Sequence, residues 1–220
     1  MNVDERMITF INSFDKANSD FLEELEQEAK RDCVPIIRKD MQNLLRFLLR
    51  LKQPVKILEV GTAIGFSAIL MGENTKADCH ITTIEKYEKR IPLAKDNFIK
   101  AGMQDRITLL EGDAGEFLAT LKPAYDFIFM DAAKAQYLSY LPDLVRLLAP
   151  GGMLVSDNVL QDGDVCESRF AVTRRNRTIH SRMRQYLYEI KNHSQLDSVI
   201  LPVGDGVTIS VKKEEDMEDV

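Results

Sequence analysis

The chain has 220 residues, of which 45% are hydrophobic and 29% are charged, and its net charge is −6. This composition is typical of a globular protein with a sizeable core, and it excludes a disordered or fibrous chain. No apolar run approaches the roughly 20 residues that a membrane-spanning helix needs, and the first residues lack the apolar core of a signal peptide. We therefore expect a single cytoplasmic domain over residues 1–220, with no membrane partner.

The first part of the chain, residues 1–54, is expected to be a helical appendage. Two stretches in it, Ser19–Arg31 and Lys39–Lys52, have helical patterns and are separated near Pro35. Such an appendage would pack on the core or on another subunit. At the other end, residues 213–220 form an acidic tail for which we expect no regular structure.

Between them, in residues 55–212, short strand-like runs alternate with longer helix-like stretches. The expected strands are Val55–Val60, His80–Glu85, Ile107–Glu111, Asp126–Asp131 and Met153–Asp157, and the expected helices are Phe66–Asn74, Tyr87–Ala101, Ala114–Leu121 and Leu138–Leu148. This alternation predicts an α/β fold of the Rossmann-like type, with a mostly parallel sheet and helices on both faces.

Two further runs, Leu196–Leu201 and Val207–Lys212, are separated by Pro202, Val203, Gly204, Asp205 and Gly206. A turn of this composition between two strand-like runs predicts a hairpin. The sheet would thus have seven strands, of which the C-terminal pair is antiparallel.

The first strand runs into a loop with the pattern Glu59-x-Gly61-x-x-x-Gly65, and a helix follows. Glycines at this point let the backbone turn sharply and approach a ligand, and the new helix offers unpaired N–H groups. The third glycine of a dinucleotide-binding loop is missing, and a carboxylate precedes the turn. A carboxylate suits a ligand with a cationic end, such as S-adenosylmethionine (SAM). The alternative is an ordinary strand–turn–helix of an α/β core.

The next two expected strands also end in residues that suit this cofactor. Glu85 follows the second strand, where an acid accepts hydrogen bonds from a ribose diol, and Gly112, Asp113 and Ala114 follow the third, near an adenine. Each has a simpler alternative, because Glu85 by itself is typical of a solvated acid and Asp113 of a helix N-cap. Their joint position at one edge of the sheet favours the cofactor interpretation.

Strands four and five end at Asp131, with Lys134 just beyond it, and at Asp157 and Asn158. Oxygen ligands on adjacent strand ends suit Mg²⁺, which completes its coordination shell with water and substrate oxygens. The three histidines and three cysteines show no metal-ligand spacing, so we expect oxygen ligands. In the alternative interpretation, the two acids cap loops and Lys134 forms an ion pair with one of them.

With these motifs in this order, residues 30–212 resemble the cation-dependent O-methyltransferases, the family of the catechol and caffeoyl-CoA enzymes. The resemblance implies a seven-stranded SAM-dependent fold, an acceptor with two neighbouring oxygens, a homodimer, and Mg²⁺ or Mn²⁺ on Asp131, Asp157 and Asn158. Lys134 aligns with the family's catalytic lysine, and Asp131 is expected to be catalytic with it. The implied cofactor-binding residues are Glu59, Val60, Gly61, Thr62, Gly65, Phe66, Ser67, Glu85, Gly112, Asp113, Ala114 and Asp131.

Within this family the chain further resembles the bacterial tRNA 5-hydroxyuridine methyltransferases, which act on the wobble position. The segment Arg169–Arg184, which we call the basic window, carries this likeness: it holds six arginines and no acid, although the whole chain is acidic. A concentrated positive charge is typical of a surface that binds RNA phosphates. We expect Arg169, Arg174, Arg175 and Arg177 to contact a tRNA anticodon loop.

Two alternatives to the tRNA function are possible. The basic window also contains an apolar stripe, which is typical of an ordinary surface helix that binds no RNA. In that case the protein would be a catechol-type small-molecule O-methyltransferase. A non-enzymic SAM- or nucleotide-binding module is the third interpretation. Lys134 would act either as a general base or by steadying an oxyanion.

Overall fold

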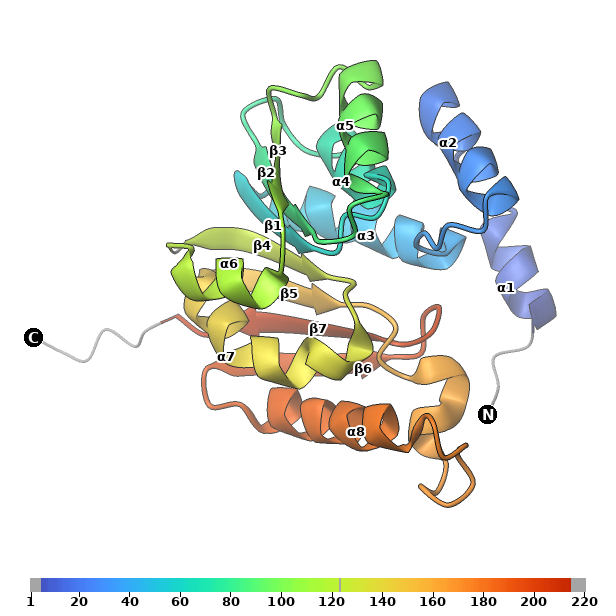
Figure 1. The fold of residues 1–220 in the computed structure, drawn as a ribbon, viewed down its shortest axis with the longest axis vertical. Helices are drawn as coiled ribbons and strands as arrows, with labels where there is room; N and C mark the ends of the chain where they lie inside the picture. The colour runs from blue at the N-terminus through green and yellow to red at the C-terminus, as the bar shows by residue number, and fades with distance from the viewer. Residues whose placement is uncertain (1–4, 123, 215–220) are drawn as a thin grey trace, which may run out of the picture. The chain divides into compact units, whose positions relative to one another are not determined.

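The computed structural model describes residues 5–122 and 124–214 (Figure 1). Residues 215–220, most of the expected acidic tail, lie outside the described residues. The seven strands have the order β3-β2-β1-β4-β5-β7-β6 in the sheet. Contacts between Cα atoms divide the chain into two compact units, which we describe separately: an N-terminal unit up to Val55 and over Thr62–Asp113, and a C-terminal unit over Lys56–Gly61 and Ala114–Val220.

The N-terminal unit combines a parallel strand pair with five helices. Its elements are α1 (Glu5–Asn12), α2 (Asp20–Arg31), α3 (Lys39–Lys52), α4 (Phe66–Glu73), β2 (His80–Glu85), α5 (Ile91–Lys100) and β3 (Ile107–Glu111). Ser19 is the N-cap of α2, and its hydroxyl accepts a hydrogen bond from the N–H of Leu22 at 3.3 Å, which satisfies one of the unpaired donors of the first turn. Helices α2 and α3 pack on α4 through a core that includes Leu22, Leu45 and Leu49.

The C-terminal unit contains the other five strands. Its elements are β1 (Lys56–Val60), α6 (Ala114–Thr120), β4 (Tyr125–Met130), the 3-10 helix η1 (Lys134–Gln136), α7 (Tyr137–Leu147), β5 (Leu148–Ser156), the 3-10 helix η2 (Gln161–Cys166), α8 (Arg177–Asn192), β6 (Leu196–Leu201) and β7 (Val207–Lys212). Strands β1, β4 and β5 are parallel. Strand β7 pairs antiparallel with both β5 and β6, which confirms the predicted hairpin and the mixed seven-stranded sheet.

Most predicted elements agree with the structure to within one or two residues, and two differ more. Strand β5 starts at Leu148 rather than at Met153, although Pro150 and two glycines follow its first residues. Its pairing with β4 is shifted in register after Tyr125, so these turn-forming residues are accommodated in an irregular strand start. Helix α5 starts at Ile91 rather than at Tyr87, with a proline in its first turn.

Helix α8 carries the second half of the basic window, and its side chains Met183, Tyr186 and Ile190 are fully buried. Figure 1 shows it running beside β6 at the outer end of the C-terminal unit. Among the residues that the structure describes, no helix has both the length and the apolar composition needed to cross a bilayer.

Candidate active site

In the N-terminal unit, the loop after β1 is held by hydrogen bonds at several points. The N–H of Gly65 donates to the carbonyl oxygen of Thr62 at 2.8 Å, which closes the turn before α4. The hydroxyl of Thr62 lies 2.5 Å from that of Thr83 on β2, and the Asn97 amide donates to the Ile64 carbonyl at 2.8 Å. The loop therefore has one defined conformation, as a ligand-binding loop needs.

The first turn of α4 follows directly and contains two of the predicted cofactor residues, Phe66 and Ser67. Both side chains are buried, so a ligand at this turn would meet mainly its backbone. Gly65 is the N-cap residue, with φ of +88°, and no side chain caps the helix. The donors that this turn offers are thus backbone N–H groups, which suit an anionic or polar ligand atom.

Glu85, at the end of β2, is tied to the same loop. One of its carboxylate oxygens accepts a hydrogen bond from the N–H of Ala63 at 2.8 Å, and the other accepts from the N–H of Tyr87 at 2.8 Å. The N–H of Gly112 donates to the Glu85 carbonyl at 2.9 Å, and Asp113 forms an ion pair with Lys86 at 3.3 Å. The structure thus brings Glu85, Gly112 and Asp113 together with Thr62–Gly65 and orients the Glu85 carboxylate.

The remaining predicted cofactor residues belong to the C-terminal unit. Glu59 and Val60 end β1 and are buried, and Ala114 begins α6. Gly61 has φ of +105°, and a Cβ atom at this position would overlap the carbonyl oxygen of Asp131. This close backbone approach explains why the position needs glycine.

The predicted metal ligands also lie in the C-terminal unit, at the ends of β4 and β5. The N–H of Asp131 donates to Val60 and the N–H of Asp157 donates to Met130, each at 3.0 Å, so the strand pairing continues to both acids. Asp157 is only 2% exposed, and one of its carboxylate oxygens accepts the N–H of Asn158 at 2.7 Å. Asn158 has φ of +59°, a left-handed conformation that asparagine tolerates.

Asp131 has an unusual titration. Burial raises the pKa of its carboxyl from 3.8 to about 6, although the positive charge of Lys134 opposes this shift. A buried carboxylate with an unfavourable charge is a suitable ligand for a cation, because the cation compensates that charge. No group of three or more His, Cys, Asp and Glu side chains suited to a metal occurs among residues 5–122 and 124–214. The candidate set is two carboxylates and one amide.

Lys134, the predicted catalytic residue, opens η1 and forms an ion pair that the sequence did not predict. Its Nζ atom lies 3.1 Å from Oδ2 of Asp205, in the turn between β6 and β7. The Lys134 side chain is 27% exposed and that of Asp205 is 4% exposed. The only signal in the sequence is an acid between two glycines, Gly204 and Gly206, in a turn whose expected role is structural.

Tyr137 is a second residue that sequence reasoning missed. Its buried hydroxyl donates to the carbonyl oxygen of Asp157 at 2.7 Å, and its ring packs edge-on against Tyr186 at 5.4 Å. Burial, followed by the charges of Asp131 and Asp157, raises the pKa of Tyr137 well above 10.0, so the phenol stays protonated and remains a donor. Tyr137 therefore fixes the backbone between the predicted metal ligands.

The basic window lies against the two short helices that follow the candidate ligands. Arg182 donates to the carbonyl of Ala135 in η1 at 3.1 Å, and Arg184 donates to the carbonyl of Val165 in η2 at 3.0 Å. Arg177 donates to Val172 at 3.3 Å and is partly buried, whereas the other predicted RNA-binding residues are exposed. Those exposed residues are Arg169, Arg174 and Arg175.

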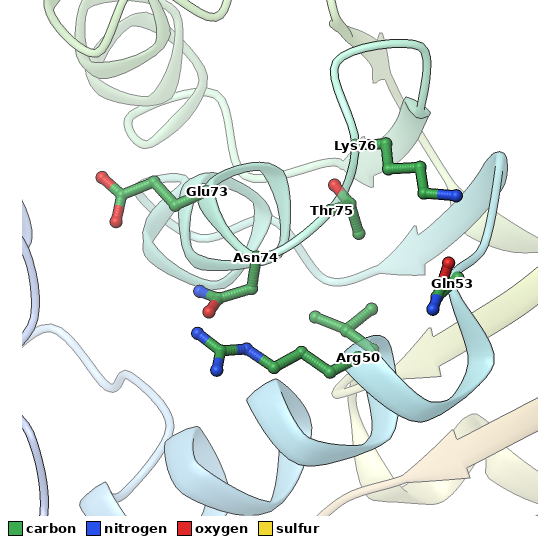
Figure 2. A pocket seen from close by; sticks show the side chains of 7 residues that line it. Arg50, Gln53, Glu73, Asn74, Thr75 and Lys76 are labelled. Atoms are coloured by element: carbon green, nitrogen blue, oxygen red, sulfur yellow. The ribbon is translucent and has the colours of Figure 1, made fainter.

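The N-terminal unit has a hollow of about 400 Å³ at the C-terminal ends of α3 and α4. Figure 2 shows the Arg50 side chain extending from α3 towards Asn74, with Gln53, Thr75 and Lys76 around the same space. The hollow is at the end of α4 opposite to the Gly65 loop. Because ligands of such sheets bind at the carboxyl ends of the strands, we assign it no catalytic role.

Comparison with known proteins identifies the family. A family model described as O-methyltransferase matches residues 12–213. The caffeoyl-CoA O-methyltransferase of Stellaria longipes is 31% identical over 178 residues, which cover 75% of this chain and 71% of that protein. A catechol O-methyltransferase of Niastella koreensis is 34% identical over 127 residues, which cover 56% and 58% of the two chains. A methyltransferase from Podospora anserina, solved with S-adenosylhomocysteine bound, aligns with a TM-score of 0.87 at 26% identity, over 97% of this chain and 98% of that one. The chain therefore belongs to the O-methyltransferase family.

Proposed function

We propose that this protein is a SAM- and Mg²⁺-dependent O-methyltransferase that methylates the 5-hydroxyl of 5-hydroxyuridine at the wobble position of tRNA. Family membership supports the reaction type, and the S-adenosylhomocysteine bound to the Podospora relative supports SAM as the cofactor. The acceptor is inferred from one observation. Arg182 of the basic window donates a hydrogen bond to Ala135 in η1, the helix that begins with Lys134, so this arginine lies close to the predicted catalytic residue in the fold.

The residues at the ends of β4 and β5 fit a hard divalent cation. Asp131, Asp157 and Asn158 offer oxygen donors in their side chains, and the desolvation that raises the pKa of the partly buried Asp131 carboxyl is a cost that a cation would offset. When bound, Mg²⁺ would supply positive charge that lowers the pKa of an acceptor hydroxyl. Tyr137 would hold the ligand-bearing backbone in place through its bond to the Asp157 carbonyl.

The other predicted site residues would bind SAM and activate the acceptor oxygen. When bound, SAM would supply an electrophilic methyl group for the acceptor oxygen, and its sulfur would keep the electron pair of the carbon–sulfur bond. The Lys134 amine either takes the acceptor proton or steadies the oxyanion, and Asp205 holds that amine in position. Glu85, oriented by the backbone N–H groups of Ala63, Lys86 and Tyr87, is suited to a ribose diol.

The RNA part of the proposal follows from the charge of the chain. Its net charge is −6, so a window of six arginines without an acid is a local exception. The hydrogen bonds shown for these arginines end on carbonyl oxygens, which leaves their charge available for phosphates. A single-stranded anticodon loop can also present an unstacked base to an enzyme pocket.

A small-molecule acceptor is the second candidate. The Stellaria and Niastella relatives are named for caffeoyl-CoA and catechol, and a catechol offers two neighbouring oxygens, as 5-hydroxyuridine does. The same lysine and oxygen ligands would serve either acceptor. The difference between the two candidates lies in the basic window.

A homodimer that uses the N-terminal helices is part of the proposal. Met7 and Phe10 on α1 and Phe47 and Leu51 on α3 are large apolar side chains that are exposed in the single chain. Helix α1 packs on α3, so these side chains belong to neighbouring elements of one unit. Burying this surface against a second copy would remove it from water.

The deciding experiment is methyl transfer from labelled SAM to tRNA that carries 5-hydroxyuridine and, in parallel, to catechol, each with Mg²⁺ and with chelator. We expect chelator-sensitive labelling of the tRNA. Labelling of catechol alone would reject the tRNA acceptor and leave the reaction type in place. If neither acceptor is labelled while SAM binds, both candidates are wrong.

A further inference from the structure

A hollow of about 400 Å³ lies in the C-terminal unit, between residues of the basic window and the two residues that precede it. It is lined by residues just after η2 and in the first turns of α8: Glu167, Ser168, Arg169, His180, Ser181 and Arg184. Two arginines and one acid give this lining a net positive charge. None of these residues belongs to the cofactor and metal motifs at the strand ends.

His180 is the buried polar residue of this hollow. It is 3% exposed, and its Nε2 atom lies 3.1 Å from the carbonyl oxygen of Glu167. A carbonyl oxygen can only accept, so Nε2 carries the hydrogen, and in the neutral ring Nδ1 is an acceptor. Within the described part of the chain, this buried Nδ1 atom has no hydrogen-bond partner. A buried acceptor without a partner is costly, so the site favours a ligand that donates a hydrogen bond.

The rim of the hollow offers the complementary groups. Ser168 Oγ accepts the N–H of Phe170 at 3.3 Å and can still donate its hydroxyl hydrogen, and Arg169 is exposed. Phe170 is not one of the lining residues but follows Arg169 directly in the chain, and it is 84% exposed, the highest value among the large hydrophobic side chains of the described chain. An aromatic ring that is this exposed between arginines is typical of a surface on which a nucleic-acid base stacks.

We propose that this hollow binds one nucleotide of single-stranded RNA next to the base that is methylated. A backbone phosphate lies between Arg169 and Arg184, the ribose 2′-hydroxyl donates to Nδ1 of His180, and the base stacks on Phe170. DNA lacks that hydroxyl, so the hollow distinguishes RNA from DNA as well as attracting phosphate. This inference rests on the proposed function, since it identifies how the basic window holds the RNA acceptor.

The test is fluorescence anisotropy with the full chain and labelled single-stranded oligonucleotides of one sequence, as RNA and as DNA. We expect the wild type to prefer RNA. His180→Leu, which fills the buried space but cannot accept a hydrogen bond, should lose this preference while its affinity for DNA is unchanged. Phe170→Ala should weaken the binding of both by about tenfold, because stacking does not depend on the sugar.

Tyr188→Ala is the matched control, because Tyr188 is an exposed aromatic residue of α8 outside the hollow, and its loss should change neither affinity. Thermal melting verifies that His180→Leu is folded. Phe170→Ala and Arg169→Ala change exposed residues, so they test the hollow independently of that buried substitution. Equal affinity of the wild type for RNA and DNA, or unchanged binding in folded Phe170→Ala and His180→Leu, would overturn the inference.

The same variants are assayed for methyl transfer to tRNA, which separates the two proposals. If the wild type methylates the 5-hydroxyuridine tRNA and the hollow variants match it in binding and transfer, only the nucleotide site is wrong. If the wild type methylates catechol alone, the tRNA acceptor is wrong. The nucleotide site is still supported in that case if the wild type prefers RNA to DNA and the His180 and Phe170 variants change binding as expected.

Discussion

The Nζ atom of Lys134 lies 3.1 Å from the Oδ2 atom of Asp205, although 71 positions separate the two residues. The bond joins η1, directly after β4, to the turn between β6 and β7. Asp205 is almost fully buried, whereas 27% of the Lys134 side chain is exposed, so a buried carboxylate anchors the amine of a side chain that still reaches the surface. This arrangement suits a group that acts on a bound acceptor.

Removing the amine should affect turnover rather than cofactor binding. We expect Lys134→Ala to lower kcat by about 10²–10⁴-fold, the usual contribution of a positioned proton-transfer group, and to leave SAM affinity unchanged. Asp205→Asn should lower kcat less and alter its pH profile. Steady-state kinetics and calorimetric SAM titration provide the readouts, and full turnover in Lys134→Ala would remove this residue from the mechanism.

In the absence of metal, the ionised Asp131 carboxylate should lower the free energy of unfolding. Because burial raises the pKa of its carboxyl from 3.8 to about 6, ionising it costs free energy in the folded state above pH 6, while below pH 4 it is protonated in both states. Asp131→Asn should therefore increase the free energy of unfolding by about 3 kcal/mol at pH 7.5. This gain should shrink as the pH falls from 6 to 4.

The measurement for Asp131→Asn is urea unfolding in chelator at several pH values. Added Mg²⁺ should stabilise the wild type and not the variant, because the variant lacks one ligand. A variant that is less stable than the wild type at pH 7.5 in chelator would contradict the assigned cost of burial.

Gly61 should tolerate no side chain. Gly61→Ala combines an unfavourable positive φ with an overlap on the Asp131 carbonyl. Gly163→Ala is the matched control, because Gly163 has φ of +92° and no heavy atom lies within 4 Å of the place that its Cβ atom would occupy. We expect Gly61→Ala to lower the free energy of unfolding by about 2 kcal/mol more than the control does. Equal losses would show that the backbone approach is not limiting.

The basic window should determine the salt dependence of RNA binding. Changing both Arg174 and Arg175 to Ala should weaken binding and reduce the slope of log Kd against log salt by about 1 for each lost phosphate contact. Arg31→Ala on α2, an exposed arginine with acidic neighbours, is the control and should leave the slope unchanged. A slope that persists in the double variant would argue against phosphate contacts at these residues.

The apolar surface of α1 and α3 should control assembly. We expect the wild type to be a dimer by light scattering and Phe47→Glu to be a monomer, because a charge would be buried without a partner. Leu93→Glu introduces the same charge at an exposed apolar residue of α5 and should leave the dimer intact. A monomeric wild type would reject the dimer directly.

Much of the fold could be predicted because its signals are local. Strands such as His80–Glu85 and Ile107–Glu111 coincide with their predicted bounds, since an apolar run between polar breaks is visible within a few residues. The start of β5 differs from the prediction because its local signal is misleading. Pro150, Gly151 and Gly152 form a turn-like sequence, but the residues on either side of them, Leu148 and Met153, pair with β4, and Met153 also pairs with β7.

By itself, the sequence determined the α/β class, the order of strands and helices, and which acids end which strands, because these follow from periodicity and from residues adjacent in the chain. Only the tertiary structure decided which side chains act together. The ion pair of Lys134 with Asp205, the hydrogen bond of Tyr137 to the Asp157 carbonyl and that of His180 to the Glu167 carbonyl all join residues that are separated in the chain. Such contacts form when burial in a shared core brings those segments together, and no local pattern records them.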